Sequence, residues 1–102
     1  MMKTDKVYTI DEIKEILAPV FKDFGVKKAA VFGSYARGQA VPGADVDLII
    51  KTRQIFDLRK YYEFENAMRH ALMTKVDVTF EDYINPFMKE DITKEAVVLY
   101  EE

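Results

Sequence analysis

The chain has 102 residues, a formal net charge of −3 and no cysteine. This length suits one domain, and a hydrophobic content of 49% is enough for a packed core. The lack of cysteine excludes a disulfide scaffold, a cysteine-ligated metal site and a cysteine nucleophile.

The negative charge argues against a protein held to nucleic acid by its overall field. No apolar run approaches the length of a membrane span, and the stretch from Met1 to Lys6 lacks the apolar region of a secretory signal. We therefore expect a single cytoplasmic domain over residues 1–102, with neither a membrane nor a nucleic acid as partner.

The first predicted element is a helix that begins after Thr9. Thr9 and Glu12 have the spacing of a capping box. Apolar residues recur at helical spacing over residues 10–24, and Gly25 stands where a C-terminal glycine cap belongs. Pro19 lies inside this stretch and predicts a kink or a local interruption.

The following elements alternate between strand and helix. A short helical turn is expected over residues 34–39, a helix that Asp57 can cap over residues 58–72, and strands over residues 29–32, 46–50 and 76–80. We expect Lys27 and Lys28 in a solvated turn. Asn85–Pro86 predicts the start of a last helix, and the apolar segment 96–100 is either the end of that helix or an edge strand. This alternation indicates an α/β or α+β protein.

A phosphate-binding turn is predicted where the strand over residues 29–32 ends. Gly33 and Ser34 follow that strand directly and begin the helical turn. The unpaired backbone N–H groups at the start of a helix, together with its dipole, attract anions such as phosphate. Gly33 allows a ligand to approach the backbone closely, and Ser34 adds a hydroxyl group.

Three carboxylates are expected to converge on this turn. Asp45 and Asp47 lie two residues apart where the second strand begins, so they face the same side of that strand. Asp77 lies near the start of the third strand. Carboxylates aimed at one point repel each other unless a cation lies between them, and oxygen ligands suit Mg²⁺. Such a set can support two-metal nucleotidyl transfer; the alternative is a group of solvated carboxylates at a sheet end.

The position of these residues also predicts the topology of the sheet. If the end of the first strand and the start of the second strand form one site, these two strands run antiparallel. The third strand must then run parallel to the second, and the intervening helix is long enough for a right-handed crossover. We therefore expect a small mixed β-sheet with helices packed against it.

The segments 32–38 and 45–48, with their Gly-Ser and Asp-x-Asp pairs, resemble the signature of the DNA polymerase β-like nucleotidyltransferase superfamily. They look most like the minimal nucleotidyltransferases (MNT), which include the antitoxins of HEPN/MNT toxin–antitoxin pairs. The resemblance spans nearly the whole chain, because segment 75–78 looks like the third-carboxylate strand and segment 95–101 like the usual C-terminal part. One minor departure is Gly43–Ala44, where members often carry a serine before the first aspartate.

The resemblance implies a nucleotidyltransferase fold and an enzyme that transfers AMP from ATP to a hydroxyl group, expected to be that of a tyrosine, on a partner HEPN toxin. It implies that Asp45 and Asp47 hold two Mg²⁺ ions with the triphosphate. Asp77 would complete the metal site, act as the base for the acceptor hydroxyl, or do both.

The same resemblance assigns the nucleotide-binding residues. Gly33 and Ser34 would bind the phosphates of ATP. Arg37 belongs to the motif as well, and it either reaches a phosphate or pairs with a carboxylate that fixes the helix. A chain of this size leaves no separate acceptor domain, so a second protein is expected to supply the acceptor in a hetero-oligomer.

Two other functions stay open at this point. A non-catalytic antitoxin of the same fold would neutralise its partner by occluding it. A nucleotidyltransferase could instead act on a small molecule or on a nucleic-acid end, although the negative charge speaks against the latter. The sequence leaves open which nucleotide is preferred, which group accepts it and what the stoichiometry of the complex is.

Overall fold

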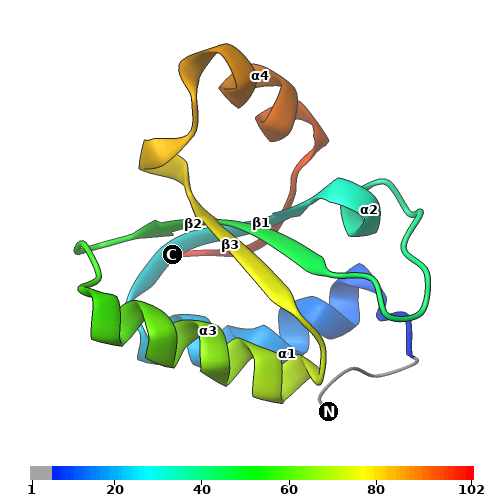
Figure 1. The fold of residues 1–102 in the computed structure, drawn as a ribbon, viewed down its shortest axis with the longest axis horizontal. Coiled ribbons are helices and arrows are strands. Elements are labelled where there is room, and N and C mark those ends of the chain that lie inside the picture. The colour runs from blue at the N-terminus through cyan, green and yellow to red at the C-terminus, as the bar shows by residue number, and fades with distance from the viewer. Residues whose placement is uncertain (1–5) are drawn as a thin grey trace.

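A mixed four-stranded sheet organises the chain in the computed structural model, which describes residues 6–102 (Figure 1). Its strand order is β3-β2-β1-β4, and the strands are β1 (Val26–Phe32), β2 (Val46–Thr52), β3 (Val76–Phe80) and β4 (Val97–Glu101). Strand β1 runs antiparallel to β2 and to β4, whereas β2 runs parallel to β3. The predicted antiparallel first pair and parallel crossover are therefore confirmed. The segment before Lys6, where the sequence shows no secretory signal, lies outside the described residues.

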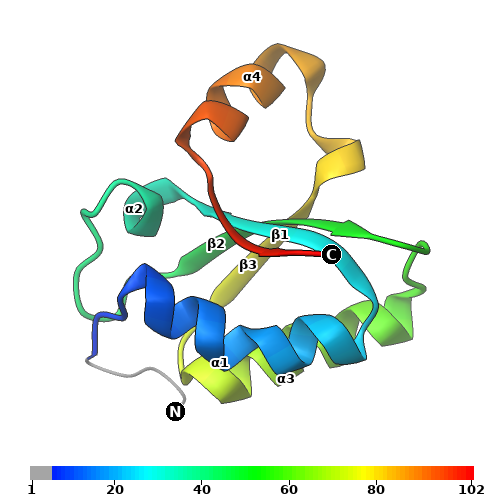
Figure 2. The same cartoon turned by 180° about the vertical axis from the view of Figure 1, so that it is seen from behind.

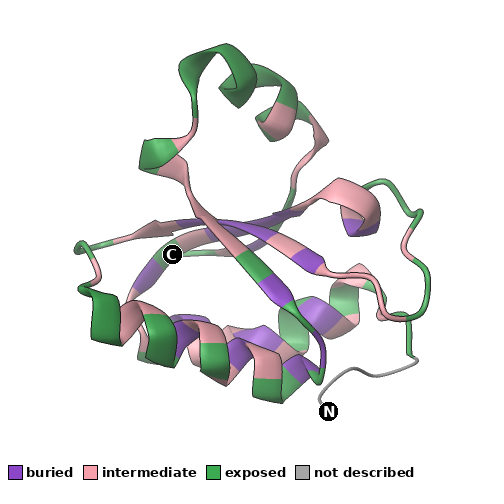
Figure 3. Cartoon of the chain, viewed as in Figure 1, coloured by how far each residue is buried: buried purple, intermediate pink, exposed green. Residues whose placement is uncertain are grey.

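Two long helices cover one face of this sheet. They are α1 (Ile10–Asp23) and α3 (Leu58–Leu72), which lie side by side in both views (Figures 1 and 2). The core fills the space between these helices and the sheet (Figure 3). Its fully buried side chains include Ile13, Leu17, Phe21, Val31, Leu48, Ile50, Phe64, Met68, Leu72 and Val76.

The remaining helical elements are short or stand away from this core. Helix α2 (Gly33–Ala36) follows β1 directly, whereas η1 (Glu81–Tyr83) and α4 (Pro86–Glu95) connect β3 to β4 on the other side of the sheet (Figure 1). Helix α4 buries none of its residues. Within residues 6–102, no helix is both long and apolar enough to span a membrane.

The capping signals of α1 act as predicted. The Thr9 hydroxyl accepts a hydrogen bond from the Glu12 N–H at 3.0 Å, and the Glu12 carboxylate accepts one from the Thr9 N–H at 2.9 Å. Gly25 follows the last turn with φ +71°, as a glycine cap requires. The predicted interruption at Pro19 is not seen, because α1 continues through it. Pro19 lies on the exposed face, where water can reach the Glu15 carbonyl that its missing N–H leaves unpaired.

One further difference concerns β1, and one open alternative is decided at the C-terminal segment. Strand β1 begins at Val26, so Lys27 and Lys28 lie within a strand and not in a solvated turn. Of the two alternatives for the apolar C-terminal segment, the structure shows the edge strand, β4, which pairs with β1 and places Lys28 opposite Glu101. Strand β1 starts early because Val26 pairs with Thr52 of β2, and from Lys28 onward it also pairs with β4.

Candidate active site

The sheet register brings the predicted phosphate turn and the carboxylates to one end of the sheet. Phe32, the last residue of β1, lies opposite Asp47 at the start of β2. In the parallel pair, Asp47 lies in turn opposite Asp77. Gly33 follows Phe32, so the turn lies beside the two carboxylates. Both pairings are needed for this arrangement. The antiparallel pairing of β1 with β2 brings the turn to Asp47, and the parallel pairing of β2 with β3 brings Asp77 to Asp47.

Gly33 is in direct contact with the carboxylate of Asp47. Its backbone has φ +73°, a conformation that side chains disfavour. A Cβ atom built on this residue would lie 2.4 Å from Asp47 Oδ2, well inside van der Waals contact. The position therefore requires glycine for two separate reasons, a strained backbone angle and a carboxylate in the space of a side chain.

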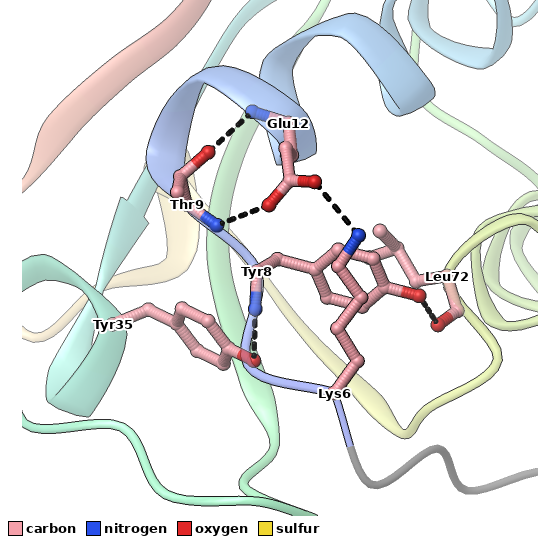
Figure 4. A network of polar contacts seen from close by, with 6 residues as sticks. All are labelled: Lys6, Tyr8, Thr9, Glu12, Tyr35 and Leu72. Atoms are coloured by element: carbon pink, nitrogen blue, oxygen red, sulfur yellow. Dashed lines mark hydrogen bonds and ion pairs between the residues drawn. The ribbon is translucent and has the colours of Figure 1, made fainter.

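Helix α2 is held in place by a buried tyrosine at its centre. Tyr35 is 5% exposed, and its hydroxyl accepts a hydrogen bond from the Tyr8 N–H at 3.4 Å (Figure 4). The Tyr8 hydroxyl donates in turn to the Leu72 carbonyl at the end of α3. Ser34, the predicted hydroxyl donor, is half-buried in the first turn of α2. The segment before α1 thus ties α2, and with it the turn at Gly33, to the helical layer.

The three carboxylates interact electrostatically. Burial raises the pKa of the Asp47 carboxyl above its usual range, and the neighbouring Asp77 and Asp45 raise it further, while Arg37 opposes the shift. The ammonium of Lys75 lies 3.8 Å from Asp45 Oδ2 and 3.9 Å from Asp77 Oδ1, so it offsets part of the negative charge. The structure therefore places Asp45, Asp47 and Asp77 close enough to interact electrostatically, and it adds Lys75, which no spacing rule singled out.

The carboxylates do not form a ready coordination shell on their own. Within the described part of the chain, no three acidic, histidine or cysteine side chains are grouped so that they could hold a metal ion together. The donor chemistry nevertheless suits Mg²⁺, because all three groups supply oxygen and repel one another without a cation. The absence of a side chain at Gly33 leaves room for one of these carboxylates, that of Asp47, to lie against the turn.

Arg37 forms an ion pair with a residue that the sequence analysis did not select. Its Nη1 lies 2.6 Å from Glu95 Oε1, at the end of α4, and its Nε donates to the Gln39 side chain. The same Glu95 oxygen accepts a hydrogen bond from the Gly33 N–H at 3.0 Å. Of the two predicted roles of Arg37, the structure shows the carboxylate pair. It also shows that the Gly33 N–H, which was expected to point outward unpaired, has a partner.

Comparison with known proteins identifies the class. Residues 10–99 match the nucleotidyltransferase domain family, and the chain belongs to this family of enzymes. A relative of Thermococcus cleftensis, protein adenylyltransferase MntA, is 32% identical over 93 residues, which cover 87% of this chain and 94% of the relative. The resemblance to the minimal nucleotidyltransferases is thereby confirmed.

Solved structures confirm the fold. A crystal structure of a toxin–antitoxin complex with AMP-PNP matches with a TM-score of 0.75 at 16% identity and covers 87% of this chain and 73% of the matched chain. A tri-AMPylated Shewanella oneidensis HEPN toxin in complex with an MNT antitoxin matches with a TM-score of 0.68 at 15% identity and covers 88% and 71%. The small mixed sheet with its flanking helices is therefore the nucleotidyltransferase fold.

Proposed function

We propose that this chain is an antitoxin that transfers AMP from ATP to a hydroxyl group, that of a tyrosine, on a partner HEPN toxin. The observation that carries the proposal is the contact between Gly33 and Asp47, because it joins a phosphate-binding turn to a cluster of carboxylates. The relative named protein adenylyltransferase and the fold shared with an MNT antitoxin bound to a HEPN toxin support this acceptor. The proposed reaction would take place in the cytoplasm, where ATP is supplied.

The carboxylates are assigned to two Mg²⁺ ions. Asp45, Asp47 and Asp77 would hold these ions together with phosphate oxygens and water, which Mg²⁺ commonly keeps as ligands. When bound, Mg²⁺ would neutralise charge on the triphosphate and on the departing pyrophosphate. Within the described residues these carboxylates do not form a metal site by themselves, so the proposal requires phosphate oxygens of the nucleotide to complete the coordination of each ion.

The residues around the carboxylates are assigned to substrate binding and proton transfer. Ser34, the start of α2 and the guanidinium of Arg37 bind the phosphates and orient them. The hydroxyl oxygen of the acceptor forms a bond to the α-phosphorus, and the bond from that phosphorus to pyrophosphate breaks. An oxygen of Asp77 takes the hydroxyl proton, since this side chain is 49% exposed and can meet an acceptor from outside.

The acceptor is assigned to a second protein. Residues 6–102 are used by one sheet and the helices around it, so this part of the chain holds no separate acceptor domain. The carboxylate end of the sheet carries exposed or half-buried side chains, among them Asp77 and Arg37. A hetero-oligomer in which the toxin presents its hydroxyl at this end completes the site.

The test is label transfer from ATP. Purified protein, ATP labelled at the α-phosphate, Mg²⁺ and the HEPN partner should give a labelled partner. The double variant Asp45→Asn with Asp47→Asn should abolish transfer while the protein stays folded. The matched control is Asp23→Asn with Asp82→Asn, which makes the same charge change at exposed positions outside the site and should retain transfer.

The same variants separate catalysis from occlusion. A carboxylate double variant that transfers no label and no longer neutralises the toxin supports the enzyme. If that variant neutralises the toxin as well as the wild type does, the chain acts by occlusion and the proposed mechanism is wrong. Label transfer that survives the double change also refutes the assignment of these two carboxylates.

A further inference from the structure

A carboxylate from a distant helix is bound at the phosphate turn. Glu95 is the last residue of α4, and its Oε1 accepts from the Gly33 N–H at 3.0 Å and from Arg37 Nη1 at 2.6 Å. A backbone N–H and a guanidinium converging on one anionic oxygen is the arrangement by which proteins bind phosphate oxygens as well. Glu95 thus occupies a position that is built for an anion.

The proposed function gives the same donors to the nucleotide. A carboxylate oxygen and a phosphate oxygen are both anionic acceptors, so they cannot use the Gly33 N–H and the same Arg37 N–H together. The Asp47 carboxylate lies against Gly33 as well, and two negative side chains therefore flank the place where the triphosphate is expected. A phosphate that enters must displace Glu95 or share Arg37 with it at a cost in repulsion.

The packing of α4 allows this displacement. None of its residues is buried, and its large apolar side chains Phe87 and Met88 are 93% and 55% exposed. In Figures 1 and 2 the helix stands off the sheet on the opposite side from α1 and α3. The pair of Arg37 and Glu95 is itself partly exposed, at 48% and 33%, so water screens it. Little packing is lost when Glu95 leaves.

We infer that Glu95 sets the nucleotide affinity of this site, because it accepts from the Gly33 N–H and from Arg37 and must give up these donors when a phosphate oxygen binds to them. The inference rests on the proposed function, since it takes Gly33 and Arg37 as phosphate-binding groups. It makes Glu95 a determinant of affinity that acts against the nucleotide, although it lies outside the Gly-Ser and Asp-x-Asp motifs.

The test measures nucleotide binding without the partner protein. Titration calorimetry of AMP-PNP with Mg²⁺ would compare the wild type with Glu95→Gln and Glu95→Ala. Glu95→Ala should bind about threefold to tenfold more tightly, given the modest strength of partly exposed, charge-assisted contacts. Glu95→Gln keeps the side-chain length and an acceptor oxygen but loses the charge, so its affinity should lie between the two. The matched control is Glu90→Gln on the same helix, which should bind like the wild type.

The outcomes separate this inference from the proposed function. Binding by Glu95→Gln that is equal to the wild type, or weaker, overturns the inference and leaves the proposed function standing. If the wild type and all variants fail to bind AMP-PNP while they melt cooperatively, the proposed function fails and the inference fails with it. Thermal melting of Glu95→Ala shows whether α4 has come loose, and Glu95→Gln keeps the test decisive in that case.

Discussion

The contact between Gly33 and Asp47 predicts that adding a single methyl group, in Gly33→Ala, lowers the stability of the fold. In Gly33→Ala the new Cβ would lie 2.4 Å from Asp47 Oδ2, and the backbone would keep a φ of +73°. Placing a residue with a side chain in this left-handed backbone conformation costs about 1–2 kcal/mol. Overpacking typically costs about another 1–3 kcal/mol. The free energy of unfolding should therefore fall by roughly 2–5 kcal/mol, and each 1 kcal/mol lowers the Tm by about 4–8 °C in a domain of this size.

Gly25→Ala is the control that separates the two contributions. Gly25 has a φ of +71°, and a Cβ atom there meets nothing within 4 Å. The free energy of unfolding of Gly25→Ala should therefore fall only by the cost of the left-handed backbone conformation, about 1–2 kcal/mol. Urea denaturation of both variants gives the steric contribution as the difference between them. Equal losses in the two variants would show that Asp47 does not limit the space at Gly33.

The same pair of variants should differ more strongly in activity. Because Asp47 must move away from the new methyl group, Gly33→Ala displaces a proposed metal ligand. A displacement of about 1 Å can cost about a hundredfold in rate. Label transfer to the partner should therefore fall about that far in Gly33→Ala and stay near the wild-type rate in Gly25→Ala. Normal transfer by a folded Gly33→Ala protein would refute the reasoning.

Three further outcomes are expected. Thr9→Ala should lower the free energy of unfolding by about 1 kcal/mol through loss of the helix cap, without changing label transfer, and parallel denaturation and transfer assays would detect any other pattern. Phe64→Ala removes a fully buried ring and should cost about 3–5 kcal/mol in urea denaturation; a change under about 1 kcal/mol would contradict the assigned core. Asp47→Asn should raise the Tm of the metal-free protein at neutral pH. The folded-state pKa of Asp47 is raised, so the wild type loses stability as the pH rises through that pKa, whereas asparagine does not ionise. The advantage should vanish below the unfolded-state pKa, and a difference in Tm that does not change with pH would contradict the shift.

The local signals of the sequence predicted most of this fold. The Thr9–Glu12 capping box, the helix after Asp57 and the apolar strands depend on residues that are close in the chain, and each of them is confirmed. The sheet topology was also predictable, because requiring Gly33 to meet Asp47 and Asp77 leaves few ways to arrange three strands. The expectation that these residues form one site thus indicated which strands lie side by side, which hydrophobic periodicity alone does not indicate.

The residues that escaped prediction are those placed by distant pairings. Glu95 and Gly33 are 62 residues apart, and they meet only because β4 returns along β1 and leaves the end of α4 beside α2. The early start of β1 also depends on distant pairings, because Val26 pairs with Thr52 of β2 and Lys28 pairs with both β2 and β4, whereas the local sequence of a lysine pair favours a solvated turn. Lys75 is missed for another reason, because a lysine near carboxylates carries no spacing signature.

The central claim is that the carboxylates beside Gly33 carry the transfer of AMP to the partner. Intact mass spectrometry of the HEPN partner, purified after co-expression, tests it most directly. Co-expression with the wild type should yield a partner heavier by whole AMP groups, and co-expression with the Asp45→Asn and Asp47→Asn double variant should yield only the unmodified mass. An unmodified partner beside the wild type, or AMP adducts beside the folded double variant, would contradict the claim.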